Sequence, residues 1–377
     1  MSKNWKPPGE LYESGSLDNA TFEIWKGSLA DKAIQQLVKR IQILIPFFIE
    51  GGQAINLEEL DWSLRRWTVF LLYKKTQDGS TSLPYTLMGY STVYRYFYLP
   101  STSVKKAPIA RPATLDFQYP LSSSLSSNDQ IKVMNTSTLY LPCRSRISQF
   151  LIFPPFQKGG NGSRFYEAIF SCYLNDAQTV EITVEDPNES FDDLRDLNDL
   201  KRLRSMSEFV SLRINSGITL GKKGRLPTDK IVNLTAIETL RKKMKIASRQ
   251  FLRLVEMQLL SLIPTSIRKS LILEPKKGDP LDLKAKEHEY YLWRLLVKQR
   301  LYRHNKDSLI QLDRAERIDK LEDALDNVEA DYARLLRALD QRSDKSVSID
   351  DSSGKRPATQ ELHGDEPLTK RVKFRDG

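Results

Sequence analysis

The chain has 377 residues, of which 40% are hydrophobic and 28% are charged, with 58 Lys and Arg against 48 Asp and Glu. This length allows two or three domains with a real core, and the net charge of +10 suits an anionic partner or ligand. Two cysteines exclude a disulfide framework and fit a reducing compartment. Residues 1–9 are polar and the most apolar run, 41–49, is too short to cross a bilayer, so we expect an intracellular protein without a signal peptide or membrane anchor.

The N-terminal part of the chain alternates between strand-like and helix-like patterns. In chain order, we predict a strand over 20–25, a helix over 30–50, and a hairpin of strands 67–73 and 85–98. The stretch 101–137 is rich in serine and proline and has no sustained periodicity. We predict that it is a disordered insertion between two strands of the sheet.

A strand, a glycine-rich loop, a helix and a second strand follow, and this unit carries the chemistry. We predict these elements over 147–153, 154–163, 164–174 and 180–184, with a charged helix after them over 191–204. A glycine loop that opens a helix offers backbone N–H groups and the positive end of the helix dipole, which together bind a diphosphate. Gly159, Gly160 and Gly162 allow close approach of the phosphates, and Lys158 adds positive charge.

The spacing within the loop narrows its class. A Rossmann G-x-G-x-x-G and a Walker Gly-Lys-Ser/Thr are both absent, whereas Gln157-x-x-Gly160-x-Gly162 resembles the pyrophosphate loop of the GNAT superfamily of N-acetyltransferases. That resemblance implies acetyl-coenzyme A as the acetyl donor. The residues that would bind it are Gln157, Lys158, Gly159, Gly160, Asn161, Gly162 and Ser163.

Acetyl transfer to a lysine requires a base, because the amine has a pKa near ~10.4 in solution and must lose a proton before it attacks. All three histidines lie in the C-terminal helices or tail, so a carboxylate is the better candidate. Glu185, followed by Asp186, ends the strand after the cofactor helix and faces the same sheet edge as the glycine loop. The alternative is an acidic loop that precedes a helix capped by Asn188 or Ser190, and spacing alone leaves both open.

Beyond about residue 206 the pattern becomes helical, with long helices predicted over 230–262 and 284–304. A heptad seam then follows, formed by Ile318, Leu321, Leu325, Val328, Tyr332, Leu335 and Leu339. It indicates either a coiled coil with a partner or a helix that docks on the chain's own bundle, and both remain open. From 343 onward the chain is polar and predicted to be disordered, and its basic clusters 355–356 and 370–373 favour a nuclear import receptor over a merely solvated tail.

Longer runs resemble one family within that superfamily. The runs 146–152, 155–157, 160–162 and 181–189, together with 88–90 and 93–96 upstream, are similar to the catalytic subunit of the type B histone acetyltransferase. The resemblance covers residues 5–100 and 145–260, and the combination is far more specific than the glycine loop alone.

The resemblance implies roles for individual residues. The backbone of Phe150, Leu151 and Ile152 would pair with the pantetheine arm as an added strand does, and Asn188 would help to hold the cofactor. Glu185 would be the general base, assisted by Asp186. Tyr94, Arg95 and Tyr96 would line the groove for the N-terminal tail of free, newly made histone H-four. The family also implies a WD-repeat histone-binding partner, location in nucleus and cytoplasm, and neither a metal nor direct contact with nucleic acid.

The expected fold is α+β: an acetyltransferase core with a mixed, mainly antiparallel sheet flanked by helices, and an α-helical C-terminal region. The predicted domains are a core over 1–205, a helical domain over 206–305, a heptad-patterned helix over 306–342 and the tail 343–377. The chain is expected to start inside the family's middle segment and to lack a further N-terminal domain. The alternatives are an N-acetyltransferase for protein N-termini or small amines, and a non-catalytic nuclear scaffold built on the heptad region.

Overall fold

The computed structural model describes residues 5–17, 20–76, 84–98, 141–218, 227–268 and 280–352. The predicted insertion 101–137 and the two basic clusters of the tail lie outside these ranges. One sheet of six strands, in sequence order, forms the centre of the core; its first five strands pair antiparallel, and the last pair is parallel. The strands are β1 (Glu10–Leu17), β2 (Ala20–Ser28), β3 (Trp67–Thr76), β4 (Tyr85–Phe97), β5 (Cys143–Ile152) and β6 (Thr179–Val184).

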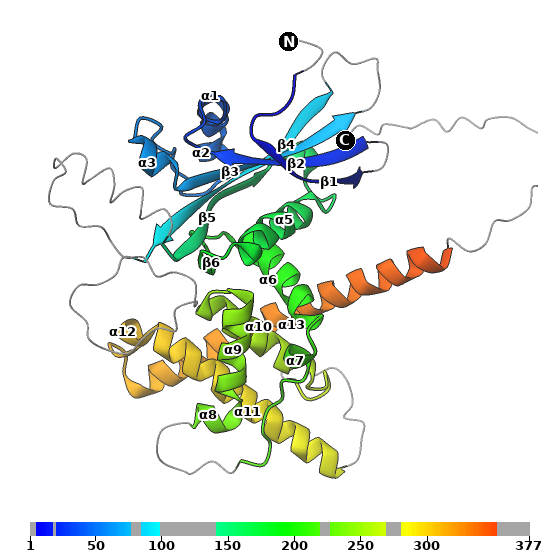
Figure 1. Ribbon diagram of the computed structural model, residues 1–377. Helices are drawn as coiled ribbons and strands as arrows, with labels where there is room; N and C mark the ends of the chain where they lie inside the picture. The colour runs from blue at the N-terminus through cyan, green and yellow to red at the C-terminus, as the bar shows by residue number, and fades with distance from the viewer. Residues whose placement is uncertain are drawn as a thin grey trace, which may run out of the picture.

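Helices cover both faces of this sheet and form a separate helical layer beyond it (Figure 1). One face carries α1 (Lys32–Ile41), η1 (Gln42–Leu44), α2 (Ile45–Phe48) and α3 (Asp61–Leu64), and the other carries α5 (Asn161–Asn175) and α6 (Glu189–Arg204). The helical layer contains α7 (Ser207–Val210), α8 (Thr228–Ile231), α9 (Leu234–Met244), α10 (Ser248–Ser261), α11 (Pro280–His304), α12 (Lys306–Leu309) and α13 (Arg314–Ser352). The expected α+β class, with a mainly antiparallel sheet and a helical C-terminal region, is confirmed. No described helix combines the length and the apolar content that a membrane span requires.

Two hydrophobic cores hold these layers together. The smaller core lies between the sheet and α1, where Trp25, Val69 and Leu71 pack against Ile34 and Val38. The larger core begins on the opposite face of the sheet and continues without interruption into the helical layer. It includes, from the sheet outward, Phe70, Ile147, Phe165, Leu200, Phe251, Trp293 and Leu335. The sheet and the helical layer therefore share the larger core.

Strand β5 contains a bulge that matters for the site. Thr92 of β4 pairs with Gln149 and the next residue, Val93, pairs with Ile147, so Ser148 is an extra residue in β5. A bulge of this kind reverses the alternation of side chains between the two faces and increases the local twist. Ile147 before the bulge and Ile152 after it both belong to the larger core as a result.

Several elements differ from the sequence predictions, and the single helix predicted over 30–50 is α1, η1 and α2 in succession. Strand β1 was not predicted, because its polar sequence alternates weakly, as edge strands often do. The single helix predicted over 230–262 is three helices, since Lys245 takes a left-handed conformation (φ 54°) and Ile246 forms a parallel bridge with Ile182 of β6. Helix α13 extends to Ser352, past the predicted helix end at 342 and into the segment predicted to be disordered.

The heptad residues of α13 pack on the chain's own helices. Leu325, Tyr332, Leu335 and Leu339 are buried in the larger core, whereas Ile318 is 50% exposed. Among the described residues the seam therefore follows the second of its two interpretations, docking on the chain's own bundle.

Candidate active site

The parallel ladder between β5 and β6 ends halfway along β5. Ile147 pairs with Val184, and the last backbone contact runs from the Glu185 N–H to the Ile147 carbonyl at 2.9 Å. From Ser148 to Ile152 no strand pairs with this edge of β5 within the described ranges. The two strands thus diverge, and the open edge can accept the backbone-like amides of an extended ligand as an added strand.

The glycine loop closes the far end of this open edge. After Ile152 the chain forms the short 3₁₀ turn η2 (Pro154–Phe156), and the Gln157 side chain folds back to donate to the Ile152 carbonyl at 2.9 Å. Asn161 donates to the Phe156 carbonyl at 2.9 Å and accepts from Arg164 at 2.7 Å. These side chains hold the loop from within, and its residues 157–160 are exposed.

Helix α5 begins at this loop, three residues earlier than predicted, without a side-chain cap. Its N-cap Gly160 has φ +75°, and an added Cβ there would meet nothing within 4 Å, so the surface above it is open. Lys158 also has a positive φ, and it is exposed with Gln157 and Gly159. Uncapped N–H groups, the helix dipole and an exposed lysine make this point suitable for a diphosphate.

Gly162 differs from Gly160 in having no positive φ, and it lies close against α6. A Cβ at this position would come within 2.8 Å of Leu194 Cδ1, where α6 crosses the start of α5. Phe150 lies beneath the same crossing, with ring centroids 5.3 Å from Phe165 and 4.9 Å from Phe191. The open edge therefore has an aromatic floor of partly and fully buried rings.

Glu185 lies where the two strands separate, as predicted. Its carboxylate accepts a hydrogen bond from the Ser148 hydroxyl and lies 3.7 Å from the Arg146 guanidinium. Its side chain is 41% exposed, so an external proton donor can reach it. Asp186, the next residue, takes a left-handed backbone conformation (φ 33°) that turns the chain toward α6.

An aromatic and cationic surface adjoins Glu185 on the face of the sheet that carries α1 and α3. The Arg146 guanidinium lies 4.6 Å from the centroid of Tyr96, and Tyr96 packs edge-on against Tyr94 at 4.7 Å. On the other side of Tyr94, Trp67 lies at 4.7 Å and the Arg66 guanidinium at 4.6 Å. Burial raises the pKa of the Tyr94 hydroxyl, with Arg66 opposing the shift.

Two predicted site residues are placed differently from the rest. Arg95 points to the opposite face of the sheet from Tyr94, where it contacts Gln178 at 3.0 Å and Asp176 at 3.3 Å, so it does not line the same surface. Asn188 caps α6 by accepting from the Phe191 N–H at 2.9 Å, as the alternative interpretation of this segment expected.

Ser148, Arg146 and Arg66 were not predicted as parts of the site. Their positions depend on the bulge at Ser148 and on the pairing of β3 with β4, which a single sequence does not reveal. The only local signal was the Arg146-Ile147-Ser148 alternation, which places two polar side chains on one side of an apolar one.

Comparison with known proteins identifies the family. Residues 1–50 match a family model described as the histone acetyl transferase HAT1 N-terminus, and residues 196–262 match one described as fungal HAT1, C-terminal. The histone acetyltransferase type B catalytic subunit of Gibberella zeae is 44% identical over 363 residues, which cover 94% of this chain and 72% of the relative. Those of Pyricularia oryzae and Neurospora crassa are 44% and 39% identical and are each covered over 70% of their length.

The chain belongs to the histone acetyltransferase type B catalytic subunit family. It is an acetyltransferase, as predicted. From its sequence, the chain is expected to start inside the family's middle segment. Residues 1–50 match the model of the family's N-terminus, so the chain contains at least a segment of that N-terminal part. Among solved structures, an aminoglycoside acetyltransferase from a soil metagenome aligns with 54% of the chain, at 12% identity and a TM-score of 0.25.

Proposed function

We propose that this acetyltransferase transfers the acetyl group of acetyl-coenzyme A to lysines in the N-terminal tail of free histone H-four, with Glu185 as general base. One observation carries the proposal: Glu185 lies at the point where β5 and β6 separate, beside the open edge of β5. A cofactor bound along the open edge of β5 would place its thioester next to the Glu185 carboxylate.

The donor would be held mainly by backbone groups. The open edge from Ser148 to Ile152 would pair with the amides of the pantetheine arm, and the loop 157–163 would bind the diphosphate at the start of α5. Gly160 suits this role because its surface carries no side chain. Asn188 contributes through its amide nitrogen, since its oxygen caps α6.

The chemical step needs a neutral amine. A lysine ammonium gives its proton to the Glu185 carboxylate, and the amine then attacks the thioester carbonyl carbon, forming a C–N bond while the C–S bond breaks. The Ser148 hydroxyl fixes one carboxylate oxygen, which leaves the other directed toward Arg146 and solvent. The acylated nitrogen loses its second proton to the departing thiolate, so coenzyme A leaves as the thiol, and the proton on Glu185 passes to solvent.

The surface formed by Arg66, Trp67, Tyr94, Tyr96 and Arg146 would hold the substrate segment that surrounds the lysine. Its flat rings suit the aliphatic stem of a lysine and the methylene groups of neighbouring residues. The histone tail and its H-four identity rest on the family resemblance. The WD-repeat partner and the location in nucleus and cytoplasm are proposals on the same basis.

The test is Glu185→Gln, measured by single-turnover acetylation of an H-four tail peptide. Loss of the base should slow transfer by about 10²-fold or more, with binding of acetyl-coenzyme A unchanged by calorimetry. Glu189→Gln removes the same charge from an exposed position in the first turn of α6 and should keep full activity. Full activity in Glu185→Gln would remove the base assignment, and faster transfer to a panel of small amines than to the peptide would remove the substrate assignment.

A further inference from the structure

A second concave site lies in the helical layer. A cavity of about 790 Å³ opens among α8, α9, α10 and α11, and none of the candidate active-site residues lines it. Apolar side chains form its floor: Val232, Ile237, Leu252, Val255 and Leu296. A cavity of this size with an apolar floor is large enough to take at least one bulky side chain or a small ligand.

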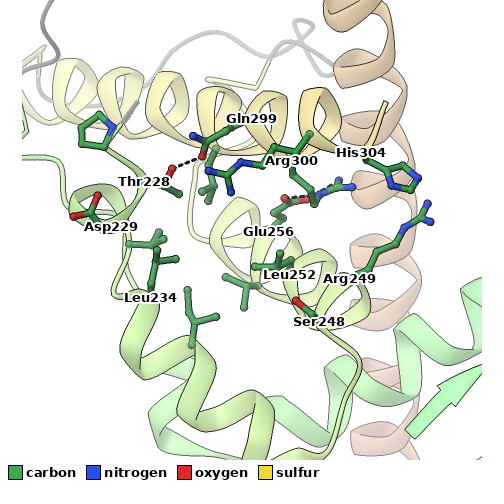
Figure 2. Close-up of a pocket in the computed structure, with 16 residues that line it drawn as sticks. Thr228, Asp229, Leu234, Ser248, Arg249, Leu252, Glu256, Gln299, Arg300 and His304 are labelled. Atoms are coloured by element: carbon green, nitrogen blue, oxygen red, sulfur yellow. Dashed lines mark hydrogen bonds and ion pairs between the residues drawn. The ribbon is translucent and has the colours of Figure 1, made fainter. Parts of the chain in front are cut away.

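The polar groups inside the cavity already pair with each other. Glu256 is 2% exposed and accepts from Arg300 at 2.7 and 2.9 Å and from Tyr332 at 2.9 Å. Thr228 donates to Gln299 across the upper wall, and Figure 2 shows both interactions as dashed lines. The interior therefore offers no unpaired charge with which to orient a small anion.

Positive charge instead gathers on the rim. Arg249 at the start of α10 and Arg303 and His304 at the end of α11 are exposed. Neither arginine has a hydrogen bond or an ion pair with any residue that the structure describes, although Arg249 interacts electrostatically with Asp192. In Figure 2, Arg249 and His304 lie on one side of the cavity, and the single rim carboxylate, Asp229, lies on the other.

We propose that this cavity is a docking site for an acidic segment of a partner protein. One large aliphatic or aromatic side chain of that segment occupies the apolar floor, and carboxylates beside it pair with Arg249 and Arg303. An apolar centre within a charged, solvated rim is the usual anatomy of a protein interface, whereas small-molecule sites place their orienting polar groups inside the pocket. Leu234, 39% exposed, carries the apolar surface out to the rim, as an extended contact requires.

The sign of the charge separates this partner from the proposed substrate. A lysine-rich tail is repelled by Arg249 and Arg303, so the cavity and the active site bind different chains. The docking site therefore does not depend on the acetyl-transfer proposal, and either can fail without the other.

Selection from a phage-displayed library of random linear peptides tests the proposal, with the wild-type chain and Arg249→Glu/Arg303→Glu as parallel targets. Wild type should enrich peptides with Asp or Glu on both sides of a Leu, Ile, Phe or Trp, and the variant should not. Because both arginines are exposed, the variant should keep the wild-type melting curve and acetyltransferase activity. No enrichment over the variant would overturn the proposal.

A fluorescein-labelled copy of the most enriched peptide then gives the affinity by anisotropy. We expect at least tenfold weaker binding to Arg249→Glu/Arg303→Glu, and also when the anchor residue of the peptide is changed to Ala. Arg314→Glu/Lys320→Glu makes the same change of charge on exposed positions of α13 that do not line the cavity, and it should bind as wild type does. Equal weakening by both double variants would show non-specific electrostatic attraction and would overturn the proposal. Displacement of the peptide by decanoate with the same affinity as the peptide would show a small-molecule site and would also overturn it.

Discussion

At the scale of a single residue, the left-handed backbone of Gly160 shapes the glycine loop of the candidate active site. Its φ of +75° lies in the left-handed region, and it ends the loop at the uncapped start of α5. Its neighbour Gly159 has no positive φ, and a Cβ there would meet only the Asn161 Nδ2 at 3.5 Å, an ordinary contact. The two glycines therefore differ in one respect, the conformation of the backbone.

Gly160→Ala should lower the free energy of unfolding by about 1 kcal/mol, because an alanine resists the left-handed conformation. Gly159→Ala should change it by less than about 0.5 kcal/mol. Urea denaturation followed by circular dichroism measures both values, provided that the slope with denaturant is the same. Equal midpoints for the two variants would show that Gly160 is free to leave its left-handed conformation.

Residue-level prediction from the sequence succeeded where spacing and local chemistry coincide. Glu185 was placed correctly because a carboxylate directly after a strand must lie where that strand ends. Arg95 was grouped with Tyr94 and Tyr96 on resemblance, although alternation along a strand puts it on the other face. Ser148 and Arg146 were missed because the contacts that bring them to Glu185 depend on an unpredicted bulge.

At the scale of elements, α11 and α13 are joined by a ladder of charges centred on Arg294. This arginine contacts Glu322 at 2.7 Å and Glu329 at 3.1 Å on α13. Glu329 is 1% exposed and also accepts from the Tyr290 hydroxyl at 2.8 and 2.9 Å, whereas Glu322 is 37% exposed. Arg294 also contacts Asp326 of α13 at 3.0 Å, so the same cation has one buried partner and two exposed partners on a single helix.

Glu329→Ala should destabilise the protein by about 2 kcal/mol, because it removes a buried carboxylate that accepts from both the Arg294 guanidinium and the Tyr290 hydroxyl. Glu322→Ala should cost less than about 1 kcal/mol, since a solvated pair contributes little. Thermal unfolding at low and high salt distinguishes the two: only the small Glu322 effect should shrink as salt rises. Similar losses for both variants would contradict this ranking by burial.

Helices and strands were predicted well where the hydrophobic periodicity is strong, and less well where tertiary contacts determine the ends of an element. The strands β2 to β6 and the helices α5, α6 and α11 appear within a few residues of their predicted bounds. The break at Lys245 was missed because it lies in a run of good helix formers. It arises from a bond between the Lys245 carbonyl and the Ile182 N–H, which lies far away in the sequence.

At the scale of the whole molecule, the continuous core predicts that the sheet and the helical layer unfold together. Leu335 of α13 is 1% exposed and belongs to the same core as Phe70 and Leu72 of β3. Leu335→Ala should cost about 3 kcal/mol through the cavity that it leaves. Hydrogen–deuterium exchange should then show faster global exchange in β3 as well as in α13.

Ile318→Ala is the matched control, because Ile318 belongs to the same heptad but is 50% exposed. It should change stability by less than about 0.5 kcal/mol and leave exchange in β3 as it is in the wild type. If Leu335→Ala loosens α13 while β3 keeps its full protection, the helical layer is an independent folding unit.

The extra residue in β5 has a consequence for how substitutions in this family are interpreted. Before Ser148 the odd-numbered side chains of the strand face α5, and after it the even-numbered side chains do. The position of the bulge therefore sets which face each side chain occupies. Deleting Ser148 would restore regular alternation along β5 and leave the Phe150 ring opposite Ser91, on the face of the sheet that carries α5. A relative that differs from this chain by a single gap at the bulge would then keep the same residues on each face of its site, but it would lose the Ser148 hydroxyl beside Glu185 and the added twist of the bulge.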